Sequence, residues 1–248
     1  NTGFNGSLDT GVTAGHYVRY NASTNMNYKT GKVNFFVNYG YNGGDNYNFG
    51  FVERPGVNLQ EFKFINENQS HLVKFGADFY LNDKNTLSFY TTQNWFDGLA
   101  SGRSRISDTN GNAPNTQDNT SPTGTYNLNY KIDFKKEGHN LELEATYSNT
   151  DAENLLTNLD DIDPTNINNY FNDIESKRNN TQLNLDYTNP LNEKTKLELG
   201  LEYRGDNTDN LNDTDQQVFT QTGQDFVGNS DFQFERNILS GYVNYAKT

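Results

Sequence analysis

The amino-acid sequence predicts an all-β fold, a transmembrane antiparallel up-and-down β-barrel, on the strength of three observations. Apolar and polar residues alternate over segments of about ten residues, as in the strands of such barrels. Short and long connections alternate between those segments, and charged side chains fall on only one side of the alternation. A period of two places apolar side chains on one face of a strand and polar side chains on the other.

The composition fits neither an ordinary soluble core nor a disordered chain. Only 32% of the 248 residues are hydrophobic, yet 17 are Phe and 16 are Tyr. Soluble domains carry roughly 45–50% apolar residues, whereas disordered chains are poor in aromatic residues. The formal net charge of -13 argues against a nucleic-acid partner, which selects basic surfaces. The lack of cysteine excludes disulfide, zinc-cluster and thiol chemistry.

No apolar run is long enough for a transmembrane helix. A closed barrel is the other structure that satisfies every backbone polar group in lipid. The first residues, Asn1–Phe4, show neither the basic nor the apolar region of a signal peptide.

The alternation predicts about ten strands. It is clearest at Tyr126–Phe134, Leu141–Tyr147 and Thr195–Tyr203, and Phe36 interrupts it in Val33–Tyr41. The expected strands cover residues 4–12, 16–28, 33–42, 71–81, 86–96, 123–134, 139–148, 180–189, 195–205 and 235–246.

The connections predict the topology. A tight turn at Ala14-Gly15 is followed by strictly alternating short and long connections, which is the pattern of an up-and-down barrel with short turns at one end and long loops at the other. A soluble β-sandwich or β-solenoid, the alternative, would have connections of similar length at both ends. The short turns are residues 29–32, 82–85, 135–138 and 191–194, and the long loops are about 43–70, 97–122, 149–179 and 206–234.

Aromatic residues near the strand ends suit the two interfaces of a membrane. They are Tyr28, Tyr41, Phe79, Tyr80, Phe134, Tyr147, Tyr187, Tyr203 and Tyr245.

The charged residues of the strands fall on the polar side of the alternation. A Lys or Arg facing lipid at mid-bilayer would cost roughly 2–4 kcal/mol, so we expect these side chains to face the lumen. They are Lys74, Asp78, Lys131, Asp133, Glu142, Glu144, Asp186, Lys196, Glu198, Glu202 and Arg204.

Several stretches resemble barrel strands of a known family. They are Gly3–Phe35, Gly76–Leu87, Asn127–Tyr130 before Gly138, Leu183–Tyr187 before Lys196-Leu197, and Asn237–Lys247. Together they are similar to strands of the TonB-dependent outer-membrane receptor superfamily, and more closely to its branch known as the outer-membrane β-barrel family. The resemblance covers most strands and short turns and none of the long loops.

The resemblance implies a 22-stranded type of barrel plugged by an N-terminal domain on which TonB pulls. This chain departs from that pattern, because it has no plug sequence, no TonB box, about ten strands and no aromatic residue at its end. We therefore expect residues 1–248 to be a partial outer-membrane β-barrel domain, an internal segment whose plug and remaining strands lie elsewhere in the polypeptide.

The expected location is the outer membrane of a Gram-negative bacterium, with the long loops extracellular. The expected partners are outer-membrane lipid, the plug domain of the same polypeptide, TonB through that plug, and a surface lipoprotein or other envelope protein.

The expected function is TonB-dependent uptake of a substrate too large for porins. The alternative is a non-transporting, receptor-like barrel that serves as a structural subunit of an outer-membrane assembly. An open diffusion pore ranks last, because about ten strands would leave a lumen mostly filled by side chains.

Catalysis has little support, so no enzyme is expected. His16, His71 and His139 are far apart in sequence, and no nucleophile motif accompanies them. Glu142 and Glu144 point the same way from one strand, but in a lumen they would hydrate the interior or pair with cations, which we expect to be Lys131, Lys196 or Arg204.

No cofactor or metal is expected either. Asp108–Asn112 starts like a calcium loop, but Ala113 and Asn119 stand where that loop needs Gly and Glu. The acidic clusters Asp160–Asp163 and Asp206–Asp215 are explained by the turn-forming role of Asp and Asn, ahead of calcium binding.

The long loops contain aromatic residues that would either stack on a sugar, a siderophore or a lipoprotein, or pack the loops together over the barrel mouth. We favour packing, because packed loops need some apolar core. The residues are Tyr47, Phe49, Phe51, Tyr170, Phe171, Phe219 and Phe226.

Overall fold

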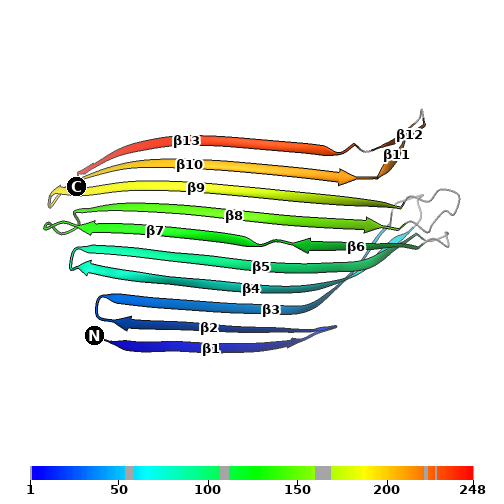
Figure 1. Ribbon diagram of the computed structural model, residues 1–248, viewed down its shortest axis with the longest axis horizontal. Helices are drawn as coiled ribbons and strands as arrows, with labels where there is room; N and C mark the ends of the chain where they lie inside the picture. The colour runs from blue at the N-terminus through cyan, green and yellow to red at the C-terminus, as the bar shows by residue number, and fades with distance from the viewer. Residues whose placement is uncertain are drawn as a thin grey trace.

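A computed structural model describes residues 2–53, 59–106, 112–159, 169–220, 223–226 and 228–247. The described regular structure is entirely β, and eleven strands form one antiparallel sheet (Figure 1). The bounds are β1 Gly3–Ala14, β2 Val18–Thr30, β3 Val33–Val52, β4 Gln60–Asn82, β5 Asn85–Ile106, β6 Asn112–Thr120, β7 Thr123–Asp133, β8 Asn140–Asn158, β9 Tyr170–Asn192, β10 Thr195–Thr214, β11 Gln217–Thr220, β12 Gly223–Phe226 and β13 Ser230–Lys247.

The strands follow one another across the sheet in chain order. The spatial order is β1-β2-β3-β4-β5-β6-β8-β9-β10-β13, with β7 pairing β5 and β8. β6 and β7 thus lie end to end between β5 and β8, while β11 and β12 form a separate hairpin (Figure 1). The predicted all-β, antiparallel, up-and-down topology is confirmed. Among the described residues, no helix is long and apolar enough to span a membrane.

The predicted short turns are confirmed, and their residues explain them. Gly31 and Gly138 adopt positive φ values of 55° and 73°, which glycine tolerates without a steric penalty. At the other two turns an Asn side chain accepts a hydrogen bond from the backbone two residues later. Oδ1 of Asn82 lies 2.9 Å from the amide nitrogen of Lys84, and Oδ1 of Asn192 lies 3.0 Å from that of Lys194.

The predicted long loops are wrong over much of their length, because the strands continue through them. β4 and β9 each have 23 residues, so they are about 75 Å long, whereas a membrane-spanning strand needs about 9–11 residues. In the predicted loop 43–70, Asp45 pairs with Glu67 and Phe51 with Glu61. Tyr47, Phe49 and Phe51 still alternate with polar or small residues there, but the many Asn and Gly residues are typical of loops. β6, which lies inside the predicted loop 97–122, has no apolar-polar alternation and was not predicted.

Register divides the sheet into two faces along its full length. We call the face that carries Leu143, Leu185 and Leu201, which are opposite one another, the apolar face. The other face, with Glu142, Asp186 and Gly200 in register, is the polar face. Since successive side chains alternate between faces, this assignment extends to every paired residue.

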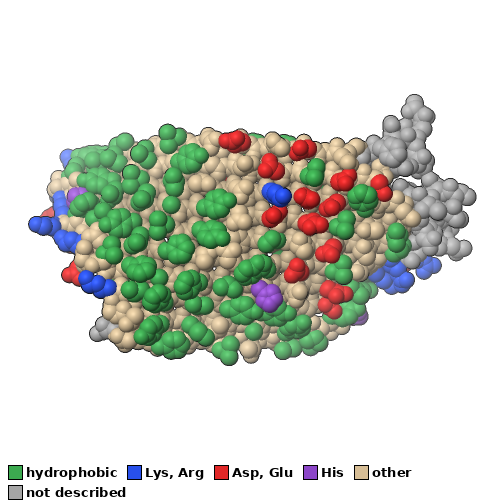
Figure 2. All heavy atoms as spheres, viewed as in Figure 1, with side chains coloured by type: hydrophobic (Ala, Val, Ile, Leu, Met, Phe, Trp, Pro, Cys, Tyr) green, Lys and Arg blue, Asp and Glu red, His purple; other side chains and the backbone are tan. Residues whose placement is uncertain are grey.

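The apolar face is free of charge toward the short-turn end. In the half of each long strand nearest the short turns, and throughout β1, β2 and β7, it carries no Asp, Glu, Lys or Arg except Lys247, near the end of the chain. Figure 2 shows hydrophobic side chains gathered over this part and acidic ones toward the long-loop end. The sheet therefore carries an uncharged band suited to lipid, and a charged extension beyond it.

The sheet has no interior of the kind that a sandwich has. The buried hydrophobic residues of the described chain are Ala77 and Ala113, and large apolar side chains such as Leu8, Leu201 and Val243 are exposed. β1 and β13 form the two edges, each paired on one side. The strands are thus held by their backbone ladders, and their apolar side chains require a surrounding apolar phase.

A charge placed on the band should be far more costly than the same charge on the polar face. We expect Leu185→Lys to lower the free energy of unfolding from lipid vesicles by about 2–4 kcal/mol. The neighbouring Asn184→Lys, on the polar face, should change it by less than about 1 kcal/mol, because its ammonium remains in a polar environment. Guanidinium titration of the full polypeptide in vesicles measures both, and equal effects would contradict the face assignment.

Candidate functional site: the polar face of the sheet

The pairing register places all eleven predicted charged residues on the polar face. Asp186, for example, lies opposite Glu142 of β8 and Gly200 of β10, and Lys131 of β7 lies opposite Glu142. That this face lines a lumen stays a prediction. The residues are Lys74 and Asp78 on β4, Lys131 and Asp133 on β7, Glu142 and Glu144 on β8, Asp186 on β9, and Lys196, Glu198, Glu202 and Arg204 on β10.

Amide and hydroxyl groups from neighbouring strands hold the carboxylates. Asn129 donates to Glu142 over 2.7 Å and Asn127 donates to Glu144 over 2.8 Å. Asp78 on β4 is bound from both sides in the same way, by Asn34 at 3.1 Å and Ser88 at 2.8 Å. Neutral donors therefore fix these carboxylates in place and leave their negative charge uncompensated.

Of the two roles expected for Glu142 and Glu144, pairing with Lys131, Lys196 or Arg204 is not found, because each of these cations lies beside an acid on its own strand. Nζ of Lys196 lies 2.5 Å from Glu198, Arg204 contacts Glu202, and Nζ of Lys131 lies 3.6 Å from Asp133. Residues two apart on a strand share a face, so the local partner is reached first. Such half-exposed pairs contribute at most about 1 kcal/mol each.

A glycine allows one tyrosine to bridge three strands. Tyr242 of β13 lies opposite Gly200 of β10, and a Cβ at Gly200 would overlap the tyrosine ring. Because that space is free, the ring crosses the middle strand and its hydroxyl donates to Asp186 of β9 over 2.7 Å. Sequence reasoning missed this contact; a glycine at a polar-face position of a long strand was its only signal.

A second glycine supports an aromatic and cationic cluster. Gly76 of β4 lies between Phe36 of β3 and Tyr90 of β5, and a Cβ there would overlap atoms of both side chains. Nζ of Lys74 lies 4.2 Å from the centroid of the Tyr90 ring and 5.8 Å from that of Phe36. The ammonium is held by ring faces in a cation–π arrangement.

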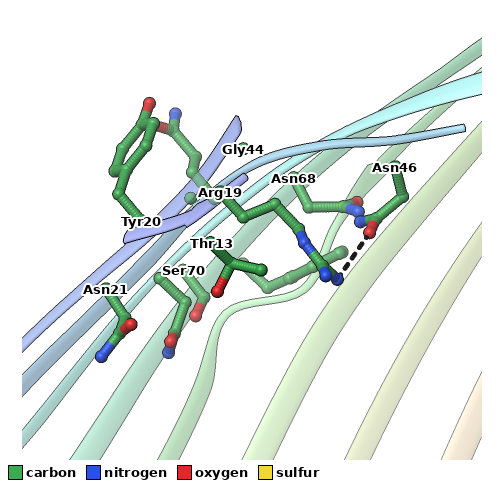
Figure 3. A pocket seen from close by; sticks show the side chains of 12 residues that line it. Thr13, Arg19, Tyr20, Asn21, Gly44, Asn46, Asn68 and Ser70 are labelled. Carbon is green, nitrogen blue, oxygen red and sulfur yellow. Dashed lines mark hydrogen bonds between the residues drawn. The ribbon is translucent and has the colours of Figure 1, made fainter. Parts of the chain in front are cut away.

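A cavity of about 500 Å³ opens near the long-loop end of β1 to β5 (Figure 3). Nη1 of Arg19 donates to Oδ1 of Asn46 over 3.1 Å across it. Gly44 has a φ of 131°, and a Cβ there would lie 2.6 Å from the carbonyl oxygen of Val18, so only glycine fits. The other lining residues are Thr13, Tyr20, Asn21, Asn42, Gly43, Asn68, Gln69, Ser70 and Phe96.

The three histidines do not converge, and each contacts aromatic side chains. His71 is hydrogen-bonded to the Tyr39 hydroxyl at 2.9 Å and His139 to the Tyr187 hydroxyl at 3.0 Å. The ring of His16 stacks on that of Tyr47, with centroids 4.6 Å apart. His71 lies in the middle of β4, whereas His16 and His139 lie in the connections before β2 and β8, and these contacts give all three structural roles.

No group of three or more His, Asp or Glu residues is arranged to hold a metal ion in the part of the chain that the structure describes. The calcium-like stretch at Asp108 and the cluster Asp160–Asp163 lie outside the described residues. Asp206–Asp215 runs along and just past the end of β10, where alternate residues point to opposite faces.

The expected packing of loop aromatics is wrong for three residues, because they lie on a strand. Tyr47, Phe49 and Phe51 follow one another along β3 on the apolar face, and their exposed fractions are 39%, 51% and 62%. Tyr170 and Phe171 begin β9. The side chains of Phe219 and Phe226 lie outside the described part.

Filling the space at Gly200 should displace Tyr242 and break its bond to Asp186. We expect Gly200→Ala to lower the free energy of unfolding by about 1–3 kcal/mol. Gly40→Ala is the matched control, since a Cβ there would meet only Leu72, at 3.9 Å. That control should be neutral or slightly stabilising. Denaturant titration compares the two, and equal stability of both variants would contradict the bridging role of Tyr242.

Comparison with known proteins adds one finding and two absences. Residues 132–248 match the model described as "Outer membrane protein beta-barrel family". No curated protein and no solved structure matches the chain. The match runs from the end of β7 through β13 and includes the bridge of Tyr242. The C-terminal part of this antiparallel sheet is therefore similar to outer-membrane β-barrel proteins, which implies a location in the outer membrane.

Proposed function

We propose that residues 1–248 form part of the barrel wall of a TonB-dependent outer-membrane receptor. This receptor would take up a substrate too large for porins, without catalytic residues or a resident cofactor. The observation that carries the proposal is the fixed array of charged groups on the polar face of β7 to β10, to which Tyr242 of β13 is hydrogen-bonded. A folded plug seated against that array would meet charges already held in position.

The chemistry of the array suits a plug that must move. Glu142, Glu144 and Asp186 are each hydrogen-bonded by a neutral group, so each keeps lone pairs for a further donor. Water replaces such contacts at little net cost when the surfaces separate, since the net worth of one hydrogen bond is about 1 kcal/mol. An apolar interface would resist separation in proportion to its area.

A second candidate is a non-transporting, receptor-like barrel that serves as a subunit of an outer-membrane assembly. The observation that favours it is the length of β4 and β9, which continue past the uncharged band. A rigid, acidic extension of this kind would offer another envelope protein a large surface. Dependence on TonB separates the two candidates.

The test is the accessibility of the array in living cells. We expect Glu144→Cys, in the full polypeptide, to react with an impermeant maleimide several-fold faster when TonB is present and energised than in a strain without TonB. Leu143→Cys is the matched control, which should stay unreactive in both strains because it faces lipid. Identical rates for position 144 in the two strains would support the assembly subunit instead.

A further inference from the structure

The polar face of β3 to β6 carries no charge toward the long-loop end. Its residues there are amides, hydroxyls, small residues and phenylalanines, and we call this surface the amide groove. Its members are Asn42, Gly44, Asn46, Asn48 and Gly50 of β3, Gln60, Phe62, Phe64, Asn66, Asn68 and Ser70 of β4, Phe96, Gly98, Ala100, Gly102 and Ser104 of β5, and Ala113, Asn115, Gln117 and Asn119 of β6.

The opposite face of the same segments carries many charged residues, so the composition of these segments does not explain why the groove is uncharged. Those charged residues are Asp45, Glu61, Lys63, Glu67, Asp97, Arg103, Arg105 and Asp118. Both faces lie beyond the uncharged band, where lipid no longer selects side chains. A functional reason is therefore needed for the absence of charge from the groove.

Glycines let three phenylalanine rings lie flat in the groove. A Cβ at Gly50 would overlap the ring of Phe62, and one at Gly102 would overlap that of Phe64. A Cβ at Gly98 would lie 2.9 Å from Cζ of Phe96. A ring that covers a glycine backbone with one face presents its other face to the groove.

Two cavities adjoin along these rings. The cavity of about 500 Å³ includes Asn46, Asn68 and Phe96, and the next, of about 550 Å³, includes Asn48, Asn66, Phe62, Phe64 and Gln117. Phe96 of β5 pairs with Ser70 of β4. Ser70 is six residues from Phe64 on the same strand, a distance of about 20 Å. A ligand that contacts both rings must be an extended chain.

We infer that the amide groove binds a neutral oligosaccharide, an inference that rests on the proposed uptake function and names its substrate class. Sugar rings present flat C–H surfaces that pack on aromatic faces. Their hydroxyls both donate and accept, as Asn and Gln amides do. A purely apolar ligand would leave the amides unpaired. Among the described residues that line the two cavities, a strongly anionic ligand would find one cation, Arg19, at the border of the groove.

The test is saturation-transfer NMR on the full polypeptide in detergent micelles, with maltohexaose, laminarihexaose, cellohexaose and xylohexaose as probes. At least one probe should receive saturation at its ring protons. The double variant F62A/F64A should weaken its binding by about tenfold or more, which corresponds to the loss of about 1.4 kcal/mol of stacking. Phe51→Ala is the matched control, since this ring lies on the other face, and it should leave binding unchanged.

The variant F62L/F64L keeps large apolar side chains at both positions and is the control for loss of folding. It should retain the β-sheet circular dichroism of the parent and still lose most of the affinity. Binding of none of the four probes, or equal losses in F62A/F64A and Phe51→Ala, would overturn the inference. Micelle binding needs no TonB, so binding without TonB-dependent labelling at position 144 would refute the uptake function alone. TonB-dependent labelling without binding would refute the oligosaccharide alone.

Discussion

The backbone ladder is the interaction on which the rest of this structure depends. Over the residues that the structure describes, the sheet has no second layer and almost no buried apolar residue, so neighbouring strands rely on paired N–H and C=O groups. In lipid those groups have no other partner, and leaving one unpaired would cost several kcal/mol. Register is fixed in turn by the two faces, because a slip of one residue would turn Glu142 toward lipid and Leu143 toward the polar face.

Glycine has an unusual role in this setting. In a sheet with a core a strand glycine leaves a gap, but on the polar face it makes room for a neighbour's ring. Gly200 lets Tyr242 reach Asp186, and Gly50 and Gly102 seat the rings that line the amide groove. The polar face thus divides into a charged part, suited to a plug, and an uncharged part, suited to a ligand. This division joins the proposed receptor to its proposed substrate.

Sequence predicted the part of the fold that lipid constrains. Leu141–Tyr147 alternates because one face must be apolar, and the short turns are marked by Gly31 and Asn82. Beyond the band neither face is constrained in that way, so β6 shows no alternation to detect. The extension of β3 to Val52 does alternate, but it is rich in the Asn and Gly residues that are typical of loops. The charged residues were predicted as a set, because residues an even number of positions apart on a strand share a face. Their hydrogen-bond partners depend on register between strands, which no single segment encodes.

The most direct test of the account is a fluorescence scan along β8 of the full polypeptide in vesicles. An environment-sensitive dye would be attached to single cysteines at each position from 141 to 155, and lipid-borne and aqueous quenchers would be compared. The account predicts lipid quenching at odd positions up to 147, aqueous quenching at even positions, and aqueous quenching at odd positions from about 151 onward. Aqueous quenching at positions 143 and 145, or lipid quenching that continues to 153, would contradict it.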